Sequence, residues 1–191
     1  MARPKSEDRR AALLSAATTI FAEHGIGAPT ALISKTAGVS EGSFFTYFKT
    51  KDELINALYR EIRLDVAAAV MDGFPRKASV RDRLRHVWMR YVSWGAENPA
   101  TRRALKHVSM SKLIREDVRA ESGVLFADVD RLQFDAVEQR QLQHLPHELA
   151  SQTLKALAEM TMDMIERQPE RAEEYKAAGF QMLWGALTSK P

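Results

Sequence analysis

The apolar residues of this chain recur at helical spacing almost throughout, and strand-like alternation is nearly absent. In the first such stretch, Leu13, Ala17 and Ile20 stand at i, i+4 and i+7, which places them on one face of a helix. Glu7 and Asp8 fall in its first turn, where the helix dipole favours acidic side chains. Runs of β-branched residues are missing and good helix formers dominate. The pattern therefore predicts an all-α protein.

Glycines, prolines and capping residues divide this pattern into about nine helices. Gly38 is expected to end one of them, because glycine enters the left-handed region without a Cβ penalty. Pro146 is expected near the first turn of another, where its missing amide costs nothing. The expected starts are Ser6, Thr30, Ser40, Thr50, Ser79, Ala100, Gly123 and Pro146, with a further short helix within residues 109–119 and a last helix after the break at Pro169.

Residues 29–51 contain two short helices joined by a tight turn. Thr30 is expected to cap the first helix and Ser40 the second. Phe44 and Phe48 stand one turn apart and are expected to point inward. Helices this short are not stable alone in water, so each must be braced by its neighbour with its polar side outward. This arrangement is typical of a helix-turn-helix, whose second helix lies in the DNA major groove.

The helix that begins at Thr50 carries Leu54, Leu58 and Ile62 on one stripe and continues to about Met71. At 1.5 Å per residue its length is on the order of 30 Å, enough to leave a small N-terminal domain and enter a second one. We therefore expect the domain boundary within its first turns. The predicted domains are residues 1–52, a three-helix helix-turn-helix domain, and residues 53–191, a helical bundle for ligand binding and dimerisation.

The segment A-G-V-S-E-G-S-F-F-T-Y-F-K-T-K-D-E-L, residues 37–54, resembles the recognition segment of TetR-type transcriptional regulators. The resemblance covers roughly residues 7–55. Elsewhere the chain is similar to such regulators only in being helical and of suitable length. The resemblance implies a homodimer that binds double-stranded operator DNA and is released by a small molecule held in the second domain.

The resemblance also implies particular DNA contacts. Lys51 and Tyr47 match phosphate-contacting positions, while Ser43 and Thr46 face outward and can bond base edges. Phe45 stands where the family often has tyrosine, so one phosphate bond is lost there. The residues expected to contact DNA are Thr30, Ser40, Glu41, Gly42, Ser43, Phe45, Thr46, Tyr47, Lys49 and Lys51. Residues 1–6, with Arg3 and Lys5, form either a disordered tail or an arm that touches DNA.

Composition narrows the function further. The chain has 191 residues, a net charge of +3 and no cysteine, which excludes disulfides, a thiol nucleophile and cysteine-based metal sites. His144 and His147 lack a carboxylate to complete a metal site, and no nucleophile elbow or Gly-rich phosphate loop is present. We therefore expect no enzyme activity, no metal and no cofactor. No signal peptide or membrane-spanning run is found, so we expect a soluble, cytoplasmic protein without membrane contact.

Two sets of residues in the second domain are candidates for function, although aromatic side chains such as those of the first set are more often core. Large apolar side chains on more than one helical face could line a cavity for an apolar or aromatic effector: Trp88, Tyr91, Phe126 and Phe134. The last two helices could pair with those of a second copy through Leu157, Thr161, Met164, Gly179, Met182, Leu183 and Ala186. The basic segment from Arg76 to Lys106 is either a solvated face or a second, non-specific contact for DNA or an anionic ligand.

These features predict a ligand-responsive DNA-binding regulator, most simply a repressor of a near-palindromic operator. Two other classes stay open at this point. One is an adaptor or scaffold protein whose N-terminal helices bind protein, and the other is an all-α enzyme. Salt-dependent binding to the protein's own upstream DNA separates the first class from both others. The sequence does not identify the effector, the operator or the regulated genes, and it does not distinguish a repressor from an activator.

Overall fold

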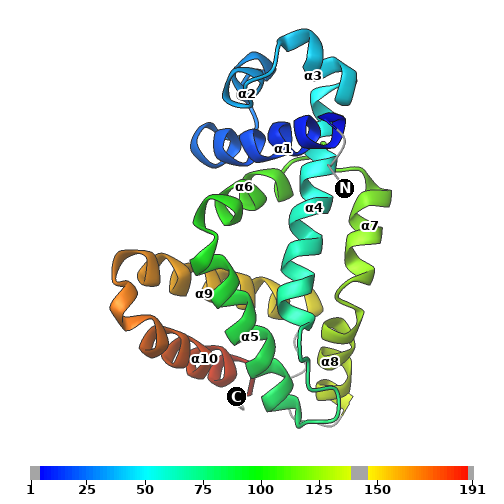
Figure 1. Cartoon of the computed structure of the whole chain (residues 1–191). Coiled ribbons are helices and arrows are strands. Elements are labelled where there is room, and N and C mark those ends of the chain that lie inside the picture. The colour runs from blue at the N-terminus through cyan, green and yellow to red at the C-terminus, as the bar shows by residue number, and fades with distance from the viewer. Residues whose placement is uncertain (1–4, 139–145, 189–191) are drawn as a thin grey trace. The chain divides into compact units, whose positions relative to one another are not determined.

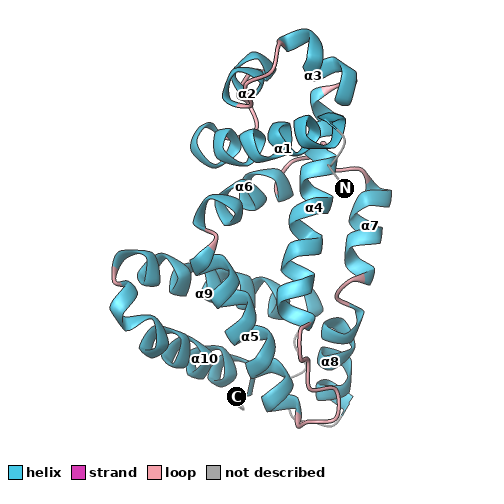
Figure 2. Cartoon of the chain, viewed as in Figure 1, coloured by secondary structure: helices cyan, strands magenta, loops and turns pink. Residues whose placement is uncertain are grey.

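The computed structural model describes residues 5–138 and 146–188. Over these residues the chain forms ten α-helices, one short 3-10 helix and no strand (Figure 2), which confirms the predicted all-α class. The helices are α1 (Lys5–His24), α2 (Thr30–Thr36), α3 (Glu41–Tyr47), α4 (Lys51–Met71), α5 (Val80–Glu97), α6 (Pro99–Ser109), α7 (Glu116–Val124), α8 (Ala127–Glu138), α9 (His147–Arg167) and α10 (Ala172–Thr188), with the 3-10 helix η1 (Pro169–Arg171). None of the described helices is both long and apolar enough to cross a membrane.

The chain divides into two compact units, each made of two chain segments. The first unit comprises Met1–Asp65 and Asn98–Gly123, and the second comprises Val66–Glu97 and Val124–Pro191. Helix α4 contributes residues to both units. The packing therefore assigns α6 and almost all of α7 to the N-terminal unit. The functional division into residues 1–52 and 53–191 stays a prediction.

In the first unit, α1 packs against α2 and, over much of its length, against α6. Figure 1 shows the blue α1 lying along the green α6, although α4 and α5 lie between them in sequence. The predicted inward stripe of α1 is buried, with Leu13 and Ala17 fully inaccessible to solvent. The unit that carries the helix-turn-helix pair therefore has a core to which α6 contributes Ala104, Leu105 and Val108.

The second unit packs α5 against α8, α9 and α10. Trp88 lies at the centre of its core, with none of its surface accessible to solvent, and its indole Nε1 donates a hydrogen bond of 2.8 Å to the Lys176 carbonyl oxygen. The core around it consists of Val80, Leu84, Val92, Leu132, Ala150, Ala158, Met162, Ile165, Phe180, Leu183 and Leu187.

Most predicted helix starts are confirmed, with two corrections. Thr30 is the first residue of α2 and not its cap: Pro29 takes the N-cap position and makes no side-chain cap bond. The helix expected to begin after Gly123 begins only at Ala127, because α7 continues to Val124. Ser122 does not break α7, since its hydroxyl donates to the Val118 carbonyl oxygen one turn earlier at 2.7 Å.

Candidate nucleic-acid interface

The turn between α2 and α3 is built by glycine and serine. Gly38 adopts a φ of +67°, which a residue with a Cβ rarely does, and its position lets the Val39 amide donate to the Ser34 carbonyl oxygen at 3.0 Å. Ser40 then caps α3, as predicted, because its hydroxyl accepts a hydrogen bond of 3.2 Å from the Ser43 amide. These local bonds fix the angle at which α3 leaves the turn.

The inner side of α3 is aromatic. Phe44 and Phe48 are buried, as expected from their spacing, and their ring centroids lie 6.0 Å apart. On its other side, Phe48 is covered by the Arg10 guanidinium of α1, whose Cζ lies 5.4 Å from the ring centroid. Arg10 of α1 thus stabilises the end of α3 through its contact with Phe48, and its position in the sequence did not indicate this role. The aromatic contacts leave the opposite side of α3 free to face solvent.

The outer side of α3 presents the residues predicted to read DNA. Glu41, Gly42 and Thr46 are exposed, and the Phe45 side chain is 45% exposed despite being apolar. Ser43 is half-buried, and its hydroxyl lies 2.8 Å from that of Ser40. The Ser40 and Ser43 hydroxyls are therefore hydrogen-bonded to each other in this structure.

Two further predicted side chains are, like Ser43, only partly accessible to solvent. Tyr47 and Thr30 are both half-buried, at the end of α3 and at the start of α2 respectively. Their outer portions still belong to the surface of the helix pair. The side chain of Lys5 and all of Arg3 lie outside the described residues.

Basic groups flank this surface. Lys49 is exposed, and its backbone amide donates to the Glu53 carboxylate at 2.7 Å, while the Thr50 hydroxyl accepts from the Glu53 amide at 3.1 Å. This reciprocal capping fixes the start of α4, where Lys51 is half-buried. Burial lowers the pKa of the Lys51 ammonium below its ordinary value, and the nearby Asp52 carboxylate opposes that shift.

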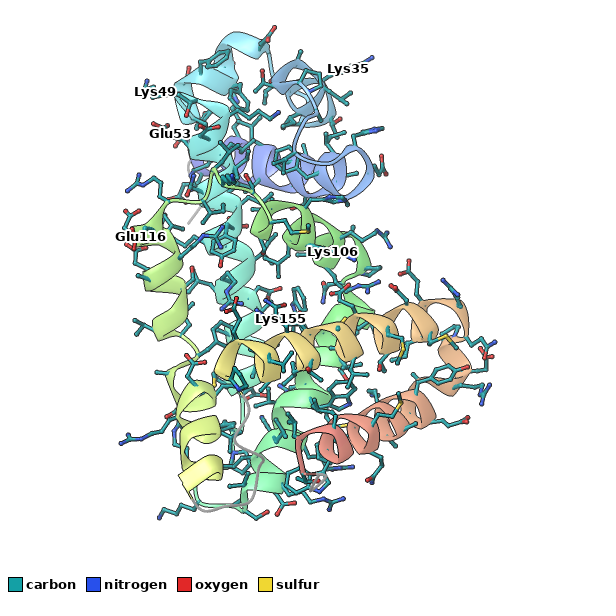
Figure 3. All side chains as sticks on the ribbon, turned by 180° about the vertical axis from the view of Figure 1, so that it is seen from behind. Lys35, Lys49, Glu53, Lys106, Glu116 and Lys155 are labelled. Carbon is teal, nitrogen blue, oxygen red and sulfur yellow. The ribbon has the colours of Figure 1, made fainter. Side chains whose placement is uncertain are left out.

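Lys35 is a further exposed cation of this unit that the sequence reasoning did not select. It lies in the last turn of α2. Figure 3 shows the side chains of Lys35, on α2, and Lys49, in the segment between α3 and α4, pointing outward, with Glu53 near Lys49. Lys35 follows the two buried residues Ile33 and Ser34 and precedes the turn at Gly38, and its side chain is exposed to solvent.

The structure places the predicted effector residues in different environments. Trp88 is fully enclosed by the core of the second unit, and its assignment to an effector pocket stays a prediction. Tyr91 is half-buried and stacks on Trp94, with ring centroids 6.2 Å apart. Phe126 is half-buried before α8. The side chain of Phe134 lies outside the described residues.

The predicted dimer residues also divide into two groups. Thr161, Gly179 and Leu183 are buried within the second unit. Leu157 and Met164 are half-buried. Met182 and Ala186 are exposed on α10, and Met160 of α9, which we had not selected, is exposed as well.

Two arginines of the basic segment from Arg76 to Lys106 form ion pairs inside the protein. Arg76 forms an ion pair of 2.7 Å with Asp128, and Arg90 forms one of 2.5 Å with Asp72. The segment also divides between the two units at residue 98. These contacts favour the interpretation of the segment as a solvated face that stabilises helix packing. Among the described residues, no group of three or more His, Asp or Glu side chains is placed to hold a metal ion.

Comparison with known proteins agrees with this geometry. Residues 13–58 match the family model of bacterial regulatory proteins of the TetR family. The chain is 40% identical over 55 residues to YhgD of Bacillus subtilis, an uncharacterized HTH-type transcriptional regulator. It is 27% identical over 82 residues to the fatty acid metabolism regulator protein of the same organism. These alignments cover 28% and 42% of this chain, and only 29% and 42% of the two relatives.

The fold extends the likeness beyond the helix-turn-helix segment. A TetR-family transcription regulator from Shewanella sp. PV-4 superposes with a TM-score of 0.83, over 95% of this chain and 99% of the other, at 22% sequence identity. At that identity the likeness concerns the fold of the chain and not its ligands. Residues 13–58 are thus similar in sequence to the helix-turn-helix segment of TetR-type regulators, and the fold of the chain is similar to that of a solved member of that family.

Proposed function

We propose that this protein is a dimeric, ligand-responsive repressor of transcription that binds a near-palindromic operator through α3. The observation that carries the proposal is the division of α3 into two sides. Phe44 and Phe48 anchor it from within, while Gly42, Phe45 and Thr46 are exposed on a rigidly capped helix. A short helix held in this way can enter a major groove without losing its own structure.

Each group on this surface has a distinct part in the proposal. Lys49 and Lys51 would contact phosphates, which contributes affinity but no sequence information. Ser43 and Thr46 would exchange their intramolecular bonds for base edges, and Phe45 would contact thymine methyl groups. Gly42 would allow the DNA backbone to come close to α3.

The proposed dimer surface is the exposed side of α9 and α10, centred on Met160, Met182 and Ala186. The half-buried Leu157 and Met164 would complete it. Pairing of two copies there would form a four-helix contact. It would present two reading helices to successive major grooves, which are about 34–36 Å apart along one face of DNA. Operator symmetry would follow from the symmetry of the dimer.

The proposed effector is a small apolar or aromatic molecule that binds the second unit. The half-buried aromatic side chains of Tyr91 and Phe126 support this assignment. One relative is named as a regulator of fatty acid metabolism, which agrees with an apolar ligand. Binding would favour a conformation unsuited to DNA, with a coupling free energy of about 1–3 kcal/mol.

Footprinting on the DNA upstream of the protein's own gene tests this function. We expect protection of a near-palindromic site whose occupancy falls steeply as salt is raised. Repeating the footprint with fatty acids, aromatic acids and sugars should identify apolar molecules that remove the protection. Absence of any salt-dependent footprint would favour the adaptor interpretation, and a footprint that no small molecule alters would leave the second unit as a dimerisation scaffold.

A further inference from the structure

The side chain of Asn56 is a buried amide with every hydrogen-bonding group in use. It lies on α4 just over one turn beyond Lys51, and only 6% of the residue is exposed. Its Nδ2 donates to the Asp52 carbonyl oxygen at 2.7 Å and to the Leu113 carbonyl oxygen at 2.9 Å. Its Oδ1 accepts from the Arg115 amide at 2.9 Å. Asn56 therefore joins the start of α4 to the loop between α6 and α7, residues 110–115.

This loop is also held from its other side. The Arg119 guanidinium of α7 donates to the carbonyl oxygens of Ser109 and Ser111, at 3.2 and 2.9 Å. Within the loop, the Ser111 hydroxyl accepts from the Leu113 amide at 3.0 Å. Ser111 and Ile114 are buried. Side chains from α4 and α7 thus form hydrogen bonds with loop backbone groups that have no partner within a helix. These bonds hold the loop in one conformation.

The loop of residues 110–115 is bonded to α4 next to the first turn of that helix, where the proposed phosphate contacts lie. The Asp52 carbonyl oxygen, bonded to Asn56, belongs to the residue directly after Lys51. Glu53 follows, and its carboxylate holds the Lys49 amide. A shift of this turn would move both lysines together. Small displacements of a contacting group have large effects on binding, because each charged contact depends on distance and direction.

We propose that Asn56 is a positioning residue for DNA binding, which fixes Lys49 and Lys51 by tying the first turn of α4 to the loop of residues 110–115. The DNA-reading part of this protein then extends beyond its three N-terminal helices and includes the segment between α6 and α7. The inference rests on the proposed function as an operator-binding protein. Asn56 itself touches no DNA in this proposal and acts only through α4.

The variant Asn56→Asp tests the proposal with almost no change in side-chain size. It replaces the NH2 donor with an oxygen that faces the carbonyl oxygens of Asp52 and Leu113, so both of those bonds are lost. In the full-length protein we expect operator affinity to fall about tenfold or more, with helix content retained in circular dichroism. The matched control is Arg60→Gln, which breaks the exposed pair of 2.7 Å between Arg60 and Glu121 of α7. The control should bind within about twofold of the wild type.

A mutant cycle with the combined variant Lys49→Ala/Lys51→Ala separates positioning from general destabilisation. If Asn56 acts through these two lysines, Asn56→Asp should cost little further affinity once both are alanine, while its effect on the melting temperature persists. Additive losses of affinity would overturn the proposal, as would an Asn56→Asp protein that binds like the wild type. Should Asn56→Asp fail to fold, Arg119→Gln loosens the same loop from its exposed side and enters the same cycle. Failure of the proposed function is distinct, because the wild-type protein would then show no salt-dependent DNA binding.

Discussion

Gly179 of α10 lies directly against the indole of Trp88 on α5. A Cβ at position 179 would come within 2.5 Å of Trp88 Cζ2 and 2.6 Å of the Thr161 hydroxyl of α9. Contacts this short are not tolerated, and Trp88 cannot move aside easily because its Nε1 is bonded to the Lys176 carbonyl oxygen. The close approach of three helices in the second unit therefore depends on the absence of a side chain at this position.

Gly179→Ala should consequently lower the free energy of unfolding by about 1–3 kcal/mol, the usual cost of overpacking a core. Urea denaturation followed by circular dichroism measures this change. Gly185→Ala is the matched control on the same helix, because a Cβ there would meet no atom within 4 Å. Alanine is the better helix former, so the control should be as stable as the wild type or more so. Equal losses in both variants would contradict the assignment.

Lys51→Ala should weaken binding to operator and to random DNA alike, because a phosphate contact carries no sequence information. The slope of log K against log salt should flatten by about one unit. Lys106→Ala removes the same charge from an exposed position on α6 and should leave the slope unchanged. Fluorescence anisotropy over a salt series measures both variants. A normal slope for Lys51→Ala would remove that residue from the interface.

Ser43→Ala and Thr46→Ala should each cost about 1–3 kcal/mol of binding free energy on the operator and less on random DNA. Ser43→Ala leaves the α3 cap intact, since Ser40 supplies the capping oxygen and residue 43 only its amide. A loss of affinity in this variant is thus not a loss of helix. Competition binding with the two DNAs provides the measurement, and equal losses on both would mean that these side chains do not specify sequence.

Gly42→Leu should abolish operator binding without harming the fold. A Cβ at position 42 would have no atom within 4 Å, so the larger side chain has room in the free protein. Stability in thermal unfolding should be kept or increased, because leucine favours helix over glycine. In the complex, the same side chain would occupy the space that we assign to the DNA backbone. Retained binding by a folded Gly42→Leu protein would place the DNA elsewhere.

Met182→Glu should yield monomers with unchanged helix content and poor operator affinity. The residue is 52% exposed on α10, so a carboxylate there is solvated in the monomer but would be buried in the proposed dimer contact. Light scattering at several concentrations measures the mass. Met110→Glu, at an even more exposed methionine of the first unit, is the control and should stay dimeric. If Met182→Glu is also dimeric, the contact lies on another surface.

The helix-turn-helix pair was predictable because its signals are local. Ser40 caps α3 and Gly38 makes the turn through atoms within a few residues of each, so their types and spacing suffice. Thr30 misled for the same reason, since the neighbouring Pro29 is equally able to precede a helix and takes the cap position. Sequence spacing shows which residues are able to cap a helix. It does not show which of two adjacent candidates takes the cap position.

The remaining features depend on contacts that leave no periodic signal. The partners of Asn56 stand 57 and 59 residues away, so the return of residues 98–123 to the first unit could not be read from the pattern. An apolar stripe looks the same whether it faces a cavity or a packed helix. The pattern around Trp88 therefore gave no sign of the close contact between its indole and Gly179.

The division of each unit between two stretches of chain limits how this regulator can be recombined with others. A chimaera that joins its residues 1–65 to a foreign effector domain would keep Asn56 but lose Leu113 and Arg115, leaving a buried amide facing new neighbours. Transfer of operator specificity should therefore require residues 98–123 to travel with the N-terminal helices. Natural exchange of effector domains among related proteins would be constrained in the same way, because residues 1–65 and 98–123 would have to be inherited together.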